Sequence, residues 1–469
     1  MARNRKKLFK NVTISGIADK GRAVGRTEEG IVLFVEGAVP GDVMDVLTYK
    51  KKKGIFIGVP DTYHKKSEDR QEPICQHFGE CGGCKWQHLK YSGQLIHKDK
   101  VVQDAFRRIA KVEVGEFLPI LGAEKIYHYR NKIEYSFLSK KWIPQEIIDK
   151  GEEVDFKNGL GFHRAGAFDK VVDIETCHLQ NEPSNDIRNT LRQYTKDWNI
   201  SYYDVKTHEG FMRNIFLRNN RKGEWMVNLI VAKDQKDILF PMLEMLLVKF
   251  PMIKSLWYTV NEKVNDSIFD LEVIHYGGNK FLDESLGKVK FQIGPKSFFQ
   301  TNTHQAEVLY ATTAEFAGLT GNENVYDLYT GLGSIALYIA DRCNHVVGIE
   351  EIEAAIEDAH KNKELNGISN ATFYAGDVKN ILTDDFAKKH GKPDLLITDP
   401  PRAGMHKGVV EMLLKLESPK IVYVSCNPAT QARDVQILSE KYTITKVQPV
   451  DMFPQTHHIE NVALLELKK

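Results

Sequence analysis

A cysteine ends an apolar run near the C-terminus. The run 420–425 leads into Ser425-Cys426-Asn427-Pro428, with Arg433-Asp434 a few residues further on. A cysteine at the carboxyl end of a strand can act as a nucleophile, because a thiolate adds to electrophilic carbon readily and also leaves readily. The alternative is a buried structural cysteine. Considered without the other motifs, Cys426 fits this alternative better. Cys343 lies near no comparable polar group, so we expect it to be structural.

Two carboxylate residues, Asp399 and Glu460, each lie next to an apolar run like the one that precedes Cys426. Asp399 begins Asp399-Pro-Pro-Arg-x-Gly404, where two prolines fix the backbone and hold the carboxylate at the strand end. Glu460 follows His457-His458-Ile459 and is a carboxylate at the start of the apolar run 461–467; the alternative interpretation is a strand residue that faces water. If the two histidines lie on this strand, their side chains point to opposite faces, and a shared metal ion is not expected.

A third group of residues fits a nucleoside cofactor. Gly331 and Gly333 follow the run 324–329 and allow a sharp turn close to a ligand. Glu350 ends the next run, where a carboxylate can accept hydrogen bonds from ribose hydroxyl groups. Asp377 ends the third run and is placed to bind an adenine amino group. Asp327, ahead of the glycines, fits the ammonium group of S-adenosylmethionine (SAM) better than a dinucleotide.

The spacing Cys75-x5-Cys81-x2-Cys84 predicts a metal site. Three thiolates need a fourth ligand, and Cys177 is the other cysteine of the middle region. Both zinc and iron–sulfur clusters accept four thiolates. The three-plus-one spacing favours a 4Fe–4S cluster over a zinc ribbon, which usually has two C-x2-C pairs.

The elements that must position these residues fall into three predicted domains: 1–62, 63–294 and 295–469. Short β-like runs in the first predict a small OB-like barrel, in which Lys50 to Lys53 lie between the last two strands. The second reads as a mixed α+β region with a helix over 89–112. In the third, strands alternate with helices, which predicts a doubly wound parallel sheet with every polar motif at the carboxyl ends of its strands.

Composition limits the class of protein. The chain has 469 residues, of which 42% are hydrophobic and 27% are charged, so it can build packed cores. Residues 1–70 hold 15 Lys/Arg against 9 Asp/Glu, although the net charge is only +1. This asymmetry suggests a polyanion-binding module, with a solvated surface as the alternative. Neither a secretory signal nor an apolar run long enough to span a membrane is evident, so we expect a cytoplasmic protein without membrane contact.

Taken together, these motifs resemble those of the RNA 5-methyluridine (uracil-5-) methyltransferases, most closely the iron–sulfur type that modifies 23S ribosomal RNA. Its most specific pieces are Ser297-Phe-Phe-Gln300, the Asp399 motif, Ser425-Cys-Asn-Pro with Arg433-Asp434, and His458-Ile-Glu460. The resemblance implies a Rossmann-like SAM-dependent methyltransferase domain at 295–469 and makes the barrel an RNA-binding TRAM domain. It makes Cys426 the nucleophile and Glu460 the base. It assigns a 4Fe–4S cluster to Cys75, Cys81, Cys84 and Cys177, and SAM contacts to Gln300, Tyr329, Ser334, Glu350, Asp377 and Asp399.

The resemblance leaves the RNA open. We expect 23S rRNA as substrate, with tRNA as the alternative, and a monomeric enzyme. A methyltransferase for another base position is a competing interpretation, although cytosine-5 enzymes typically use two active-site cysteines and only Cys426 stands here. A non-catalytic RNA-binding protein or a radical iron–sulfur protein is a third interpretation. It explains neither the pairing of Cys426 with Glu460 nor the five-residue gap between the first two cysteines.

Overall fold

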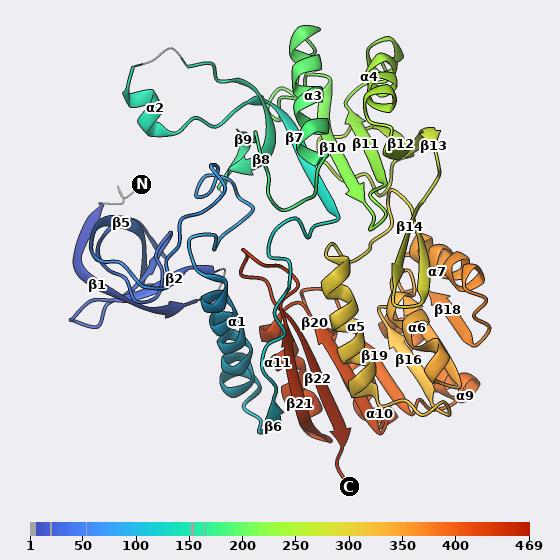
Figure 1. The fold of residues 1–469 in the computed structure, drawn as a ribbon. Coiled ribbons are helices and arrows are strands. Elements are labelled where there is room, and N and C mark those ends of the chain that lie inside the picture. Colours follow the sequence, from blue (N-terminus) through green and yellow to red (C-terminus); the bar gives the residue numbers. More distant parts are fainter. Residues whose placement is uncertain (1–5, 19–20, 53, 152–153, 165) are drawn as a thin grey trace.

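The computed structural model describes residues 6–18, 21–52, 54–151, 154–164 and 166–469. It has three parts: an N-terminal barrel, a central sheet that carries two helices, and a C-terminal sheet with helices on both faces (Figure 1). The long helix α1 (Tyr91–Ala105) connects the barrel to the C-terminal part.

The N-terminal strands close into the predicted five-stranded barrel, in the order β1-β2-β3-β5-β4. Buried and half-buried residues alternate in β3 and in the first part of β4, because successive side chains point into the barrel and out of it. Lys50, Lys51 and Lys52 belong to the end of β4 and pair with β5, so they lie in a strand rather than in a connecting turn. Lys53 lies outside the described residues. The strands are β1 (Lys7–Ile17), β2 (Ala23–Arg26), β3 (Val32–Val35), β4 (Val43–Lys52) and β5 (Ile55–Lys65).

The central part is built on a seven-stranded, mostly antiparallel sheet in the order β13-β12-β11-β10-β7-β8-β9. The helices α3 (Ser184–Asp197) and α4 (Lys236–Lys249) pack on it and share one core with it. The short helix α2 (Gln145–Asp149) lies apart from this core. The strands are β7 (Lys132–Lys140), β8 (Lys157–Arg164), β9 (Ala167–Asp173), β10 (Met212–Asn219), β11 (Trp225–Val231), β12 (Ile253–Val260) and β13 (Ile274–Gly278).

The C-terminal part contains the expected doubly wound sheet. Its eight strands have the order β18-β17-β16-β19-β20-β22-β21-β6, and the first five are parallel. The strand order reverses at β16 and β19, the point at which such sheets bind ligands. The strands are β6 (Val114–Phe117), β16 (Asn324–Leu328), β17 (His345–Glu350), β18 (Ala371–Ala375), β19 (Leu395–Thr398), β20 (Lys420–Ser425), β21 (Tyr442–Val450) and β22 (Glu460–Leu467).

Helices bury both faces of this sheet. Neighbouring residues of one strand, such as Val325 and Tyr326, enter two different cores because their side chains point to opposite faces. The helices are α5 (Thr303–Ala317), α6 (Ser334–Ile339), α7 (Glu353–Leu365), α8 (Val378–Ile381), α9 (Asp384–His390), α10 (Lys407–Leu416) and α11 (Pro428–Leu438), with a 3-10 turn at Ala340–Arg342. The hairpin β14 (Leu282–Leu286) and β15 (Val289–Ile293) packs beside α7.

Two segments from early in the chain join the C-terminal part. β6 pairs in parallel with β21 and forms the edge of the large sheet. α1, with the π-helical turn Phe106–Ala110 that continues it, packs its buried residues into the same core as α11. The predicted helix over 89–112 thus exists, but it serves the last third of the chain. The domain boundaries at 62 and 294 remain predictions.

Candidate active site and cysteine pocket

The sheet register brings the two predicted catalytic residues together. β20 runs antiparallel to β22, with Ser425 paired to Asn461 and Val424 to Val462. One step further along the same register lies Cys426 opposite Glu460. Neither side chain belongs to the core: Cys426 is half-buried at the strand end, and Glu460 is buried with 5% of its surface exposed. The alternative interpretation required Glu460 to face water, and the buried position of its side chain contradicts it.

The environment of Cys426 disfavours its charged form. Burial raises the pKa of its thiol to about 11, and the carboxyl groups of Glu460 and Asp399 add to the rise. Arg402 acts in the opposite direction: its positive charge and a hydrogen bond to Cys426 lower the pKa. The thiolate that a nucleophile needs is therefore stabilised by Arg402 and opposed by its other neighbours.

The two carboxyl groups beside Cys426 are themselves protonated more easily than usual. Burial and the nearby charge of Asp327 raise the pKa of Asp399 to about 7. Burial and Asp399 raise the pKa of Glu460 well above its usual value, whereas Arg402 lowers it. Perturbed carboxyl groups that influence each other beside a cysteine are typical of sites that transfer protons.

The loop after Asp399 is fixed by the helix that follows Cys426. The side-chain amide of Asn427 donates to the carbonyl oxygen of Arg402 at 2.9 Å. Asp434 accepts from the backbone N–H of Met405 at 2.9 Å and is itself 1% exposed. Gly404 has φ +78°, and a Cβ there would lie 2.6 Å from the Arg433 guanidinium. These contacts explain why the two motifs occur together: Arg433 and Asp434 brace the loop that carries Asp399 and Arg402.

Three of the residues predicted to contact SAM, Tyr329, Glu350 and Asp377, lie at the ends of β16, β17 and β18. The backbone N–H of Gly331 donates to Glu350 at 3.1 Å, which fixes the glycine turn against the next strand. Tyr329 has φ +65°, a conformation rare for a residue with a side chain and one that is concentrated at functional sites. Burial raises the pKa of Tyr329 to about 12, and the charges of Asp377 and Glu350 add to the rise.

Tyr310 joins the remaining predicted contacts. Its hydroxyl group is 2.9 Å from Ser334 Oγ, and it also hydrogen-bonds to Gln300. Burial raises the pKa of this hydroxyl group, and the charge of Asp399 adds to the rise. Tyr310 was missed by sequence reasoning because it lies in α5 without a motif around it.

Asp327 and Asp377 differ in whether both oxygens of the carboxylate have a partner. Asp327 accepts from Ala336 N–H and Thr330 through Oδ2, whereas its buried Oδ1 has no hydrogen-bond partner among the residues that the structure describes. Burial raises its pKa to about 7. Asp377 caps α8 by accepting from the backbone N–H of Lys379, and its other oxygen forms an ion pair with the Lys379 ammonium group. The unpartnered oxygen of Asp327 fits a cationic ligand group.

The histidines beside Glu460 differ from expectation. His457 and His458 precede β22 rather than lying in it, and their rings are 4.2 Å apart between centroids. The argument that a strand separates them to opposite faces was therefore wrong, because the chain is irregular at this point. In the Ser297 motif, Phe299 is buried in the core, while Phe298 is 69% exposed.

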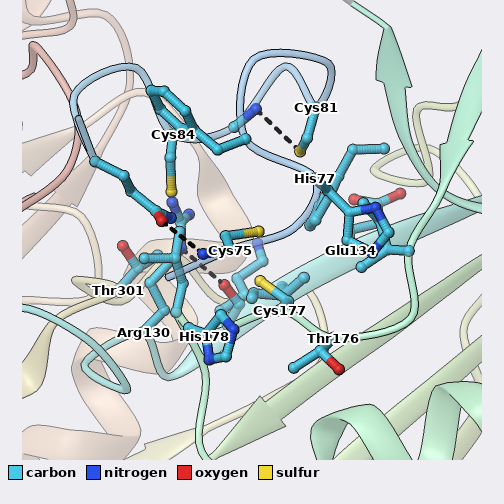
Figure 2. Close-up of a pocket in the computed structure, with 18 residues that line it drawn as sticks. Cys75, His77, Cys81, Cys84, Arg130, Glu134, Thr176, Cys177, His178 and Thr301 are labelled. Atoms are coloured by element: carbon cyan, nitrogen blue, oxygen red, sulfur yellow. Dashed lines mark hydrogen bonds between the residues drawn. The ribbon is translucent and has the colours of Figure 1, made fainter. Parts of the chain in front are cut away.

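The four predicted cluster ligands line one cavity of about 370 Å³. Figure 2 shows the side chains of Cys75, Cys81, Cys84 and Cys177 turned into this pocket. The first three come from a loop without regular structure, residues 75–88, which we call the cysteine loop. Cys177 comes from the segment between β9 and α3. The loop backbone points N–H groups at sulfur: Gly83 N–H donates to Cys81 Sγ at 3.4 Å.

The pocket disfavours free thiolates. Burial raises the pKa of both Cys81 and Cys84 to about 12, and the other cysteines of the pocket contribute to the rise. Within the described part of the chain, no three His, Cys, Asp or Glu side chains are close enough to hold a single metal ion.

The C-terminal sheet, with its strand order and glycine turn, defines the class of SAM-dependent methyltransferases. A family model described as tRNA (Uracil-5-)-methyltransferase matches residues 280–468, and a TRAM domain model matches residues 9–54. The chain is 48% identical to an uncharacterized RNA methyltransferase of Bacteroides thetaiotaomicron, over 96% of this chain and 100% of the relative. It is 40% identical to one of Chlorobaculum tepidum, over 99% and 97% of the two chains.

A solved structure agrees along the whole chain. The Pyrococcus abyssi tRNA (uracil-54, C5)-methyltransferase in complex with S-adenosyl-L-homocysteine has a TM-score of 0.75 and 30% sequence identity, covering 97% of this chain and 99% of that one. The protein belongs to the family of SAM-dependent RNA (uracil-5-)methyltransferases. The predicted family, enzyme class, TRAM barrel and SAM are thereby confirmed.

Among the described residues, no helix is long and apolar enough to cross a membrane.

Proposed function

We propose that the protein methylates C5 of a uridine in RNA through a covalent bond between Cys426 and C6 of the base. The observation that carries this proposal is the β20–β22 register, which sets Cys426 opposite Glu460 with Asp399 and Arg402 beside both. A thiol next to a carboxyl group of raised pKa suits a reaction in which a nucleophile adds and a base later removes a proton.

The reaction needs the cysteine because C5 of uracil is a weak carbon nucleophile. The Cys426 thiolate adds to C6, and the electron pair of the C5–C6 double bond moves toward C5 as an enolate. SAM supplies an electrophilic methyl group on its sulfonium. C5 takes this methyl group, the sulfur–methyl bond breaks, and C5 then carries both a hydrogen and a methyl group. Glu460 removes the C5 proton, the C6–sulfur bond breaks, and Cys426 leaves as a thiolate.

The pKa shifts suit these roles. A carboxylate with a raised pKa is a stronger base, which favours removal of the C5 proton by Glu460. Arg402 favours the thiolate form of Cys426 when it attacks and when it leaves. Asp399 orients the uracil by a hydrogen bond to its edge.

SAM is held by residues from five loops in this proposal. Asp327 receives the methionine ammonium group on its unpartnered oxygen, and Glu350 receives the ribose hydroxyl groups. Asp377 takes the adenine amino group, which requires its ion pair with Lys379 to open. Gln300, Tyr329, Ser334 and Asp399 complete the contacts.

We assign the cysteine pocket to a 4Fe–4S cluster ligated by Cys75, Cys81, Cys84 and Cys177. The common cavity and the N–H groups aimed at sulfur support this assignment. When bound, the cluster supplies a structural cross-link between the cysteine loop and Cys177, and methyl transfer requires no redox step from it.

The barrel, taken as residues 1–62, binds RNA in this proposal, and 63–294 forms the central domain. Exposed lysines of β4 support RNA binding, because phosphate contacts by lysine account for much of the affinity for RNA. The target uridine must leave its stack to reach Cys426. We place the enzyme in the cytoplasm, as a monomer.

We propose 23S rRNA as the first substrate to test. tRNA is the second candidate, because the solved structure that matches the whole chain is described as a tRNA methyltransferase. That match includes the barrel, so the three-part architecture does not separate the two RNAs.

The test is a covalent trap. The protein and SAM are incubated with 23S rRNA segments or tRNAs in which 5-fluorouridine replaces uridine. Fluorine at C5 cannot be removed as a proton, so the methylated adduct should remain on Cys426 and survive denaturation. Cys426→Ala should give no adduct while still binding SAM. Absence of an adduct with every RNA, although SAM binds, would overturn the proposal and favour another target atom.

A further inference from the structure

The segment that leads to Glu460 is fastened to the cysteine loop. The backbone N–H groups of Lys85 and Trp86 both donate to the carbonyl oxygen of Gln455, at 2.8 and 3.1 Å. Lys85 directly follows Cys84, and Gln455 precedes Glu460 by five residues. A single carbonyl group therefore connects the proposed cluster ligand to the segment 451–459, which we call the base loop.

Helix α1 holds the same residue from a second side. The side-chain amide of Gln94 donates to Gln455 Oε1 at 3.0 Å, and its oxygen accepts from the Gln455 backbone N–H at 2.9 Å. The Gln94 amide also donates to the carbonyl groups of Trp86 and Leu89, at 3.1 and 2.9 Å. Both glutamines are fully buried. The amide pair thus joins the cysteine loop, α1 and the base loop at one point.

A buried ion pair fixes the start of the base loop. The ammonium group of Lys98 lies 2.6 Å from Asp451, both side chains are 0% exposed, and Lys98 also donates to the carbonyl of Phe453 at 3.0 Å. Tyr91 donates to the second oxygen of Asp451 at 2.9 Å. Replacing a buried ion pair by apolar residues is often neutral for stability, so such a pair is better understood as fixing a particular geometry.

The backbone of Gln455 shows that this geometry is imposed. Its φ is +68°, in the left-handed region that favours glycine. A glutamine stays in that conformation only where its surroundings determine it. Those surroundings include the two N–H donors from the cysteine loop and the amide of Gln94, in addition to the turn in which the Thr456 N–H donates to the carbonyl oxygen of Phe453 at 3.3 Å.

We propose that Gln455, held by Gln94 and by the cysteine loop, is a positioning residue that aims Glu460 at the substrate. When the cysteine loop is well ordered, its contacts to Gln455 thereby fix the position of the Glu460 side chain. The inference rests on the proposed function, because it assumes that Glu460 removes the C5 proton. It assigns to the cysteine loop a role in the last step of the reaction, although none of its residues touches the substrate.

The test separates the two halves of the reaction. Attack by Cys426 and methyl transfer do not need Glu460 and are measured by the rate of trapping on 5-fluorouridine RNA. Proton removal does need it, and a slow last step leaves the methylated adduct on ordinary uridine RNA. Gln94→Leu should raise that adduct about tenfold while changing the trapping rate by less than about twofold. Gln455→Gly, which relieves the backbone and loses one hydrogen bond, should raise it about threefold.

The matched control is Asn228→Leu. Asn228 is an equally buried amide, hydrogen-bonded to Thr259 within the central sheet at 3.1 Å. This variant should leave the ratio of adduct to trapping unchanged. A parallel fall of trapping and turnover in Gln94→Leu, or an unchanged adduct, would overturn the positioning role. If the parent protein itself fails to trap on fluorinated RNA, the proposed function falls, and the inference with it.

A second readout does not depend on activity. Reconstituting the iron-free parent protein with iron and sulfide should slow amide hydrogen exchange in the base loop as well as in the cysteine loop. In Gln94→Leu the slowing in the base loop should be at least about fivefold smaller, because the variant loses both hydrogen bonds between Gln94 and Gln455 and about fivefold is the change expected from one. If reconstitution of the parent protein slowed amide hydrogen exchange only in the cysteine loop, this result would contradict the proposed coupling between the cysteine loop and the base loop.

Discussion

The end of the C-terminal sheet and the cysteine loop are positioned in opposite ways. At the sheet, backbone register sets Cys426 opposite Glu460, and Asp434 braces the loop of Asp399. The cysteine loop has no ladder of its own. Its side chains gather around a cavity of about 370 Å³, and its backbone is held by contacts to other segments.

The difference shows what each region needs in order to function. A site built on hydrogen-bonded strands has its geometry before any ligand binds, so each substitution there should change chemistry more than stability. A loop whose ligands surround a cavity gains order from what fills the cavity, so substitutions there should act on stability first. Gln455 is the place at which the two kinds of region meet.

The largest effect is expected at the sheet, from Glu460→Gln. The amide has nearly the same shape and cannot accept the C5 proton, so turnover should fall by roughly 10²- to 10⁴-fold. Adduct on ordinary uridine RNA should accumulate at the same time, because the earlier steps remain. Turnover is measured as release of 5-methyluridine-containing RNA. A variant that turns over normally would remove Glu460 from the reaction.

The cysteine loop is tested by Cys84→Ser, with Cys343→Ser as its control. Cys343 is buried, whereas Cys84 is half-buried, and Cys343 lies outside the pocket. Cys84→Ser should lose the iron-dependent absorption and lower the free energy of unfolding by about 3 kcal/mol, the size expected when a ligand far above its Kd is lost. Cys343→Ser should keep the absorption. Equal behaviour of the two variants would mean that the pocket holds no cluster.

A smaller effect, dependent on pH, is expected from Arg402→Ala. Arg402 lowers the pKa of Cys426, whose value is about 11, so its removal leaves still less thiolate at neutral pH. Trapping on fluorinated RNA should slow about tenfold at pH 7. Because the thiolate fraction rises with pH, the variant should recover the parent rate about one pH unit higher. Arg402→Lys keeps the charge and should lose less; a loss that is the same at every pH would contradict this role.

The smallest effect is expected from Tyr310→Phe. The substitution removes the hydroxyl group that contacts Ser334 at 2.9 Å and leaves the ring in its core. One hydrogen bond contributes about 1 kcal/mol, so the KM for SAM should rise about fivefold while kcat stays nearly constant. A fall in kcat with an unchanged KM would instead assign Tyr310 to the chemistry beside Asp399.

Several features of the molecule follow from the sequence alone. Alternating runs and turn residues predict the barrel, and the alternation of strands with helices predicts the parallel sheet with its polar motifs at one edge. The residue types indicate which chemistry is possible, because Cys426 supplies a thiol and Asp399 and Glu460 supply carboxylates. The spacing of Cys75, Cys81 and Cys84 predicts a metal loop, which stays a prediction. These are local signals, because each depends on residues that are close in the chain.

Other features exist only in the folded chain. The placement of Cys426 opposite Glu460 depends on a strand register set across a long connection, and a shift by one residue would turn a side chain to the other face. Cys177 joins a pocket whose other cysteines lie more than ninety residues earlier. Tyr310 and Gln455 carry no motif, since their roles come from partners far away in sequence. Tertiary packing decided these contacts because local periodicity contains no information about which distant segments meet.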